Sequence, residues 1–179
     1  FQHILAGDGR SASFMAVAYA RVSGRVGVGE GPSGGGATYI VPGVAEAHGS
    51  FLPLLVLTSD TPIREEGRGV LTELDQRALF QPITKWAARM TTANTAPDVV
   101  RRALRLATTG RPGAVSISMP ADVLKAPVDE AHVYGVPQFG AAPASRPRPD
   151  SSEIERAAAL IRNAPRPVSY THLLAHATE

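Results

Sequence analysis

Residues 33–60 read SGGGATYIVPGVAEAHGSFLPLLVLTSD, and this stretch decides the fold. A glycine-rich turn at 33–39 enters a helical pattern that Pro42 must delay or kink, and the apolar run at 52–59 is the clearest buried strand of the chain. A turn, a helix and a fully apolar strand in succession are typical of a parallel sheet covered by helices.

The flanking sequence repeats this alternation of short apolar runs with helical patterns. The further elements we expect are a helix at 11–22, a strand at 25–29, a helix at 73–80, a strand at 85–91, a helix at 96–108 and a strand at 113–120. Asp8 or Ser11 would cap the first helix and Gly24 would end it, and Thr95 would cap the helix at 96–108. The predicted fold class is α/β, a doubly wound, mainly parallel sheet with helices on both faces.

Composition argues against several classes of protein. The 179 residues are 44% hydrophobic and 19% charged, enough to bury one α/β core and the start of a second, and no apolar run could cross a bilayer. The absence of cysteine removes disulfides and thiolate zinc sites. A net charge of +2, with arginines scattered among acidic residues, argues against a nucleic-acid partner. Because no signal-peptide pattern is visible either, we expect a cytoplasmic protein with no nucleic-acid or membrane partner.

The turn from Ser33 to Tyr39 is the strongest local signal. Glycines let a ligand approach the backbone, and the start of a helix offers unpaired N–H groups, so the turn is a candidate binding site. It lacks the Gly-Lys-Ser/Thr of a Walker loop and the G-x-G-x-x-G spacing of dinucleotide-binding turns. Taken alone, a tight turn that needs positive φ explains it equally well.

Four segments in succession carry a resemblance to a known family. They read SASFMAVAYARVSGRVGV, SGGGATYIVPGVAEAHGSFLPLLVLTSD, LTELDQRALFQPITKWAARM and RRALRLATTGRPGAVSISMPADV. Over residues 2–125, their order and spacing resemble the N-terminal pyrimidine-binding domain of thiamine diphosphate (thiamine pyrophosphate, TPP) enzymes of the acetolactate synthase type. The resemblance implies a transferase or carboligase that uses thiamine diphosphate on a small 2-oxo acid. It also implies a second subunit, in a homodimer or homotetramer.

The resemblance further implies which residues bind the cofactor. In the family the glycine turn lies beside the pyrimidine ring of the cofactor, and the positions that correspond are Ser33, Gly34, Gly36, Ala37 and Thr38, with Gly35 in place of a proline and Tyr39 in place of an asparagine. Two later motifs match at Glu73, Asp75, Lys85 and Trp86. Thr72 departs from the family, because acetolactate synthases have a glutamine there that faces the reaction centre.

The family's catalytic glutamate corresponds to Gly9, which we therefore also count among the cofactor-binding positions. In the family this carboxyl group hydrogen-bonds a pyrimidine nitrogen and favours the tautomer that deprotonates the reactive carbon of the cofactor. Glycine cannot do so, and the neighbouring Asp8 is better explained as a helix cap, so the catalytic residue is unknown. Three explanations are open: a variant enzyme that works without the carboxylate, a degenerate copy, and a single-base sequencing change. We favour the last two.

The tripeptide Gly7-Asp8-Gly9 resembles the family's magnesium motif but does not fit it. That motif follows a strand of a C-terminal domain and needs an asparagine further along the chain. The asparagines of this sequence are Asn94 and Asn163, which lie too far away. We therefore predict no metal site here. Magnesium would be held by a domain that this chain lacks, and FAD is a further cofactor that the resemblance allows.

The domain organisation that we expect has four parts. They are a pyrimidine-binding domain at 1–125, truncated at its start; a proline-rich linker at 126–150; the beginning of the family's central domain at 151–168; and a non-native tail at 169–179, which resembles a translated sequencing adapter. Such a fragment would be inactive by itself. The alternative is a non-catalytic α/β module of the same fold that serves subunit association. Gly9 favours this alternative, whereas the otherwise well-kept domain favours the enzyme.

Overall fold

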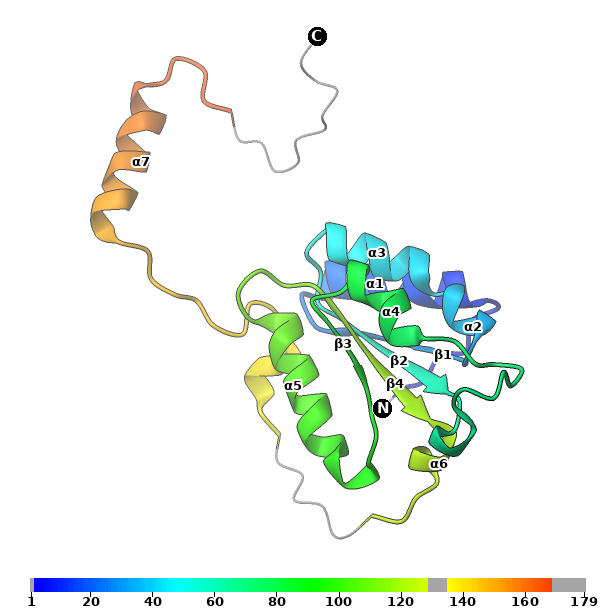
Figure 1. Cartoon of the computed structure of the whole chain (residues 1–179). Coiled ribbons are helices and arrows are strands. Elements are labelled where there is room, and N and C mark those ends of the chain that lie inside the picture. The colour runs from blue at the N-terminus through cyan, green and yellow to red at the C-terminus, as the bar shows by residue number, and fades with distance from the viewer. Residues whose placement is uncertain (1, 129–134, 169–179) are drawn as a thin grey trace. The chain divides into compact units, whose positions relative to one another are not determined.

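The computed structural model describes residues 2–128 and 135–168; the predicted tail at 169–179 lies outside these residues (Figure 1). Its helices and strands are α1 (Gly9–Ser23), β1 (Gly27–Gly31), α2 (Gly35–Thr38), α3 (Val41–Gly49), β2 (Leu54–Asp60), α4 (Gln76–Phe80), β3 (Trp86–Arg89), α5 (Ala96–Thr108), β4 (Ala114–Pro120), α6 (Ala121–Leu124) and α7 (Ser151–Asn163). Short 3-10 turns lie at Ile63–Glu65, Gln81–Ile83, Ala93–Thr95 and Pro137–Gly140. The chain forms two compact units, Phe1–Ser145 and Arg146–Glu179.

The four described strands form one sheet in the order β1-β2-β4-β3, and every pairing is parallel. β2 is central: Leu54 pairs with Gly27 of β1 on one side and with Ala114 of β4 on the other. The mainly parallel sheet predicted from the sequence is confirmed. All four strands end at the same edge of the sheet, which we call the carboxyl edge.

Helices cover both faces of the sheet, as predicted, and the strand order explains why. A connection between parallel strands is almost always right-handed. From β1 to β2 and on to β3 the chain moves in one direction across the sheet, so α3 and α4 lie on one face. From β3 back to β4 the direction reverses, and α5 therefore lies on the opposite face (Figure 1).

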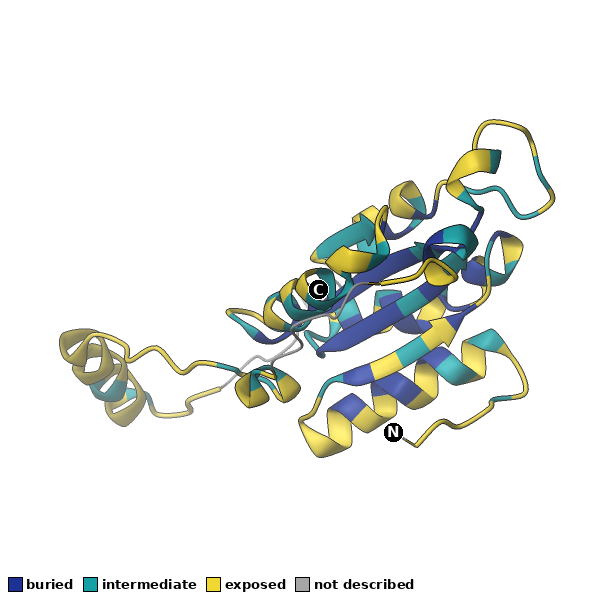
Figure 2. Ribbon diagram, turned by 90° about the horizontal axis from the view of Figure 1, so that it is seen from below, coloured by how far each residue is buried: buried dark blue, intermediate teal, exposed yellow. Residues whose placement is uncertain are grey.

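Each face has its own apolar core (Figure 2). On the first face, α1, α3 and α4 pack on β1 and β2, and the buried residues are Ala16, Val17, Ala37, Ile40, Val44, Ala47, Leu54, Val56, Phe80 and Ala114. On the second, α5 packs on β2 and β4, and the buried residues are Leu55, Met90, Ala103, Ala107, Val115, Ile117 and Val123. Successive residues of β2 supply both cores, because side chains alternate across a strand.

Some boundaries differ from those expected. The first strand spans Gly27–Gly31 rather than 25–29, and the helix expected at 73–80 begins only at Gln76, because Asp75 is its cap and Glu73 bonds the preceding loop instead. Thr95 stands at the predicted cap position of α5 but does not cap it through its side chain. Its hydroxyl donates to the carbonyl of Thr92 instead.

Part of the segment expected to be a linker contacts the domain. The N–H of Val26 donates to Gly140 O (3.0 Å), and the N–H of Ala142 donates to Gly24 O (3.1 Å). The N–H of Ala144 donates to Thr108 O at the end of α5 (2.9 Å). We call residues 137–144 the strap, because they join the start of β1 to the end of α5.

Helix α7 belongs to the second unit. Asp150 caps it, accepting from the N–H of Ser152 at 2.8 Å. None of its residues is buried, and the side chains of Ile154, Leu160 and Ile161 are exposed.

Candidate functional site

The N-terminus of α1 and the glycine turn meet at the carboxyl edge. The C-terminus of α1 leads into the start of β1, so α1 runs back along the sheet and its first residue, Gly9, lies near the end of β1. A Cβ atom at Gly9 would lie 3.0 Å from Tyr39 Cβ and 3.4 Å from Ile40 Cγ2. The structure therefore brings together two positions that stand thirty residues apart in the sequence.

The turn itself follows β1 directly, as predicted. Gly34 has φ of 59°, a conformation that favours glycine, and a Cβ atom there would lie 2.8 Å from Thr72 Cα. A Cβ atom at Gly36 would collide with the ring of Pro32, whereas one at Gly35 would meet no described atom within 4 Å. The turn is thus closely packed at two of its glycines and open at the one between them.

The remaining polar groups of the turn are Ser33 and Thr38. Ser33 is half-buried, and its carbonyl accepts from the N–H of Gly36 at 3.2 Å. Thr38 is exposed, and its hydroxyl donates to Gly35 O at 2.6 Å, inside α2. Both hold the turn in shape, and Gly35 remains the point where an outside group can approach the backbone.

Asp8 caps α1 and does not take the place of a glutamate at position 9. Its Oδ1 accepts from the N–H groups of Arg10 (2.7 Å) and Ser11 (3.1 Å), and its Oδ2 accepts from the Ser11 hydroxyl (2.9 Å). These hydrogen bonds, the backbone bond from Ser11 above all, hold the pKa of Asp8 below that of an ordinary aspartate. The carboxylate is therefore ionised and engaged at both oxygens.

A loop lies over the turn and is folded around Glu73. Glu73 Oε1 accepts from the N–H of Gly67 (2.5 Å), and Oε2 accepts from the N–H groups of Gly69 (2.7 Å) and Val70 (3.3 Å). The Gly67 bond is the main cause that lowers the pKa of Glu73. Thr72, the preceding residue, is the one that contacts Gly34.

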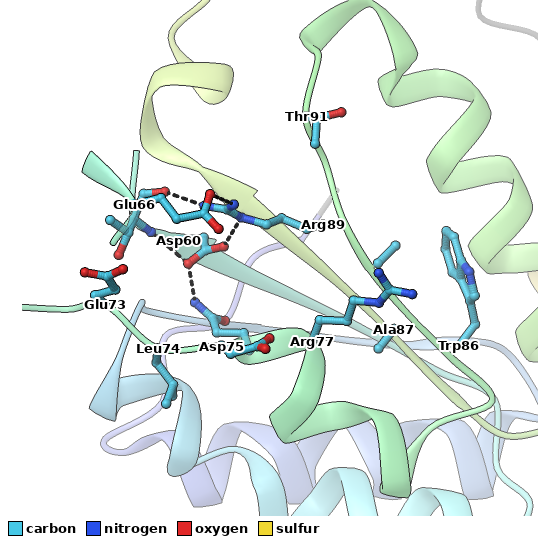
Figure 3. Close-up of a pocket in the computed structure, with 13 residues that line it drawn as sticks. Asp60, Glu66, Glu73, Leu74, Asp75, Arg77, Trp86, Ala87, Arg89 and Thr91 are labelled. Carbon is cyan, nitrogen blue, oxygen red and sulfur yellow. Dashed lines mark hydrogen bonds and ion pairs between the residues drawn. The ribbon is translucent and has the colours of Figure 1, made fainter. Parts of the chain in front are cut away.

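Beside the loop a cavity of about 590 Å³ lies along β3, from Trp86 to Arg89, and reaches the end of β2 at Asp60 (Figure 3). Arg89 crosses it: Nε donates to Asp60 at 2.7 Å and Nη1 donates to Glu66 at 2.5 Å. Burial disfavours the charged guanidinium, but these two carboxylates more than compensate and raise the pKa of Arg89. The buried Gln76 adds a bond from its amide to Asp60 (3.2 Å), so the cavity wall is a connected polar network.

Sequence reasoning missed Asp60, Gln76 and Arg89 as site-lining residues. One signal was available for two of them, because Asp60 and Arg89 are the last residues of strands β2 and β3, and polar groups there lie at the carboxyl edge of a parallel sheet. Gln76 carried no such signal, since its burial depends on how α4 packs.

Lys85 and Trp86 have structural roles. Lys85 Nζ donates to three carbonyls in and just after the last turn of α5, those of Leu106, Thr109 (2.9 Å) and Arg111 (2.8 Å). Trp86 begins the edge strand β3, and the guanidinium of Arg102 lies 5.1 Å from its ring centroid.

Two further observations concern the described part of the chain alone. Within it, His, Asp and Glu side chains do not gather in groups of three that could hold a metal ion. None of the helices in residues 2–128 and 135–168 is long and apolar enough to cross a membrane.

Several known proteins are similar to this chain in sequence. Residues 1–79 match the family described as thiamine pyrophosphate enzyme, N-terminal TPP binding domain. The chain is 36% identical to the probable acetolactate synthase large subunit of Methanocaldococcus jannaschii over 168 residues, and 35% identical to the acetolactate synthase large subunit of Corynebacterium glutamicum over 169 residues. These alignments cover 93% and 94% of the chain, but only 28% and 27% of the two relatives.

A shorter match is 40% identical over 129 residues to the acetolactate synthase large subunit of Lactococcus lactis, and it covers 72% of the chain and 22% of that protein. The glycine turn and the start of α1 both lie inside residues 1–79. The candidate site therefore belongs to the part of the chain that matches the family. The chain belongs to the thiamine pyrophosphate enzymes and contains their N-terminal TPP-binding domain. Within that class it is of the acetolactate synthase type, and it spans less than a third of the length of these relatives.

Proposed function

We propose that this domain binds the pyrimidine ring of thiamine diphosphate at the turn formed by Ser33, Gly34, Gly35, Gly36 and Thr38, with Gly9 facing the same place. The observation that supports this most directly is the convergence of Gly9 with Tyr39 at the carboxyl edge. In open parallel sheets, ligands bind outside the carboxyl ends of the strands. When bound, the cofactor supplies the electron sink for decarboxylation of a 2-oxo acid and for joining the remaining fragment to an acceptor.

The residues present fit the shape of the cofactor site but not all of its chemistry. Gly35 leaves the backbone open, so a flat ring can lie against it. No carboxylate stands at position 9, and Asp8 is held in the cap of α1. The chain's own residues would therefore bind and orient the ring, and position 9 offers no carboxyl group to hydrogen-bond its nitrogen. The same observation favours the alternative function, a non-catalytic module that serves subunit association.

The surface of α1 supports a subunit partner in either case. Its buried residues are Ser13, Ala16, Val17 and Ala20, of which Ser13 lies against Gly43 of α3 and Ala16 against Gly27 of β1. Phe14, Met15 and Tyr19 are about half exposed, and Val22 is 88% exposed. Such an apolar helix face is typical of an interface. We propose that a second subunit of a homodimer or homotetramer covers it, in a cytoplasmic enzyme that acts on a small 2-oxo acid.

We further propose that magnesium and the diphosphate are held outside this chain, and FAD, where present, likewise. The chain by itself should then bind the cofactor weakly and be inactive. Calorimetric titration with thiamine diphosphate and magnesium measures this, and binding at micromolar concentration or tighter would contradict it.

The test of the catalytic assignment is Gly9→Glu in the protein that carries this chain. A carboxyl group there should increase exchange of the cofactor's reactive C–H proton, and turnover of a 2-oxo acid, by about 10²- to 10⁴-fold. Tyr39 must shift by a few tenths of an ångström to make room, because the new Cβ atom lies 3.0 Å from its Cβ. Asp8→Asn is the control and should leave the gain intact. Equal exchange with and without the glutamate would refute the assignment.

A further inference from the structure

The loop from Gly67 to Glu73 takes its shape from a single carboxylate. Three of its backbone N–H groups, those of Gly67, Gly69 and Val70, donate to Glu73. Gly67 and Gly69 both have positive φ, at 76° and 66°, which turns neighbouring N–H groups inward. The N–H of Glu73 also donates to Val70 O at 3.0 Å. The loop therefore closes on the side chain of its own last residue.

The ends of this loop are held independently of Glu73. Glu66, just before it, is bonded to Arg89, which is also paired with the buried Asp60. Asp75, just after it, caps α4 by accepting from the N–H of Ala78 at 2.9 Å. Loss of the Glu73 bonds would therefore release the middle of the loop without detaching its ends.

Thr72, which directly precedes Glu73 at the end of the loop, contacts the glycine turn. A Cβ atom at Gly34 would lie 2.8 Å from both Cα and O of Thr72, so the two backbones touch with no side chain between them. Contact between two backbones transmits a displacement directly, because neither side can adjust by rotating a side chain. The position of Thr72 and the position of Gly34 are thus coupled.

We propose that Glu73 is a positioning residue: its carboxylate holds Thr72 against Gly34 and so fixes the turn at Ser33–Thr38. The consequence for the cofactor rests on the function proposed for that turn, whereas the coupling itself does not. Glu73→Gln keeps the size of the side chain but replaces one acceptor oxygen by an NH₂ group, which faces backbone N–H groups instead of accepting from them. The loop should then open, and the turn should lose its support.

Hydrogen exchange on the 179-residue chain tests this without any cofactor. The amides of Gly36, Ala37 and Tyr39 are bonded inside the turn, so they report its opening. In Glu73→Gln their exchange should become faster by about tenfold or more, while the amides of β2 and β4 keep their protection. The matched control is Glu65→Gln, since the half-buried carboxylate of Glu65 pairs with the adjacent Arg64 rather than with the loop amides, and the substitution should leave the exchange of these amides unchanged.

Two results would overturn the proposal. One is faster exchange confined to Gly67, Gly69 and Val70, which would limit Glu73 to a local role. The other comes from the opposite side of the contact: Gly34→Ala pushes on Thr72 and should speed exchange at Gly69 and Val70, so unchanged exchange there would refute the coupling even if Glu73→Gln failed to fold. Failure of the protein that carries this chain to bind the cofactor at the turn would refute the proposed function but would leave these exchange results as they are.

Discussion

At the scale of single residues, two neighbours in the sequence have entirely different roles. Asp8 is a helix cap whose carboxylate accepts three hydrogen bonds, and Gly9 is the first residue of the helix. The cap explains why an acidic residue stands beside the family's catalytic position without replacing it. A carboxylate that accepts from two backbone N–H groups is oriented by them, and cannot also reach a ring nitrogen.

The capping role predicts a particular dependence of stability on pH. Because the pKa of Asp8 is lowered in the folded state, its contribution to stability is fully present above the pKa of an unfolded aspartate. That contribution is lost as the pH falls through the lower, folded pKa. Asp8→Asn, which keeps a good cap but not the charge, should remove this part of the acid sensitivity, whereas Asp8→Ala should lower the unfolding temperature at every pH.

Thermal unfolding followed from about pH 6 to about pH 2.5 distinguishes these variants. As a control, Ser11→Ala removes one donor and should raise the pKa of Asp8 toward its ordinary value, which a carboxyl NMR titration would show. Identical acid sensitivity in Asp8→Asn and the unaltered chain would contradict the assignment.

At the scale of helices and strands, close crossings depend on glycine. A Cβ atom at Gly43 of α3 would lie 2.5 Å from Ser13 Cβ of α1, and one at Gly27 of β1 would collide with the carbonyl oxygen of Ala16. These two positions bring α1 close to both α3 and β1. They matter for the site because α1 carries Gly9 and α3 follows the glycine turn directly.

Gly43→Ala should therefore destabilise the domain although alanine favours helices. Forcing a methyl group into this crossing should cost about 1–3 kcal/mol of unfolding free energy. Gly49→Ala in the same helix is the matched control, because a Cβ atom there meets no described atom within 4 Å, and it should be neutral or slightly stabilising. Chemical denaturation measures both variants, and an equal effect of the two would show that the crossing can relax.

Lys85 caps the end of α5, because its ammonium group donates to the carbonyls of Leu106 in the last turn, of Thr109 at the C-cap and of Arg111 just beyond it. Lys85→Met keeps the aliphatic stem but loses these bonds, so we expect a loss of about 1 kcal/mol. Lys125, the other lysine of the chain, is exposed, and Lys125→Met should change the free energy of unfolding little. If both variants unfolded at the same denaturant concentration, the capping role of Lys85 would be disproved.

At the scale of the whole molecule, the strap extends the folded unit beyond the last strand. Two of its three backbone hydrogen bonds reach Gly24 and Val26 just before β1, and the third reaches Thr108 at the end of α5, far from them in the sequence. The compact unit accordingly extends to Ser145. The proline-rich composition after Lys125 gave no sign of this, because bonds through the backbone leave no pattern of side chains.

A truncation series tests the strap. The chain 1–145 should unfold at a higher denaturant concentration than the chain 1–125. The free energy of unfolding should differ by about 1–3 kcal/mol, because the shorter chain lacks the hydrogen bonds of the strap. The chain 1–179 should match 1–145, since none of the residues of α7 is buried. Equal midpoints for 1–125 and 1–145 would mean that the strap adds nothing to stability.

The sequence by itself determined the parallel α/β class, most of the elements, the two candidates Asp8 and Ser11 for the cap of α1, the turn after β1 and the family. These features depend on local patterns: the period of apolar residues, capping residues, and glycines at a turn. Only the tertiary structure decided the strand order, the contact of Gly9 with Tyr39, the Asp60–Arg89–Gln76 network and the packing of Thr72 on Gly34. Each of these joins residues distant along the chain, and their distances are determined by how the layers pack, which no local pattern encodes.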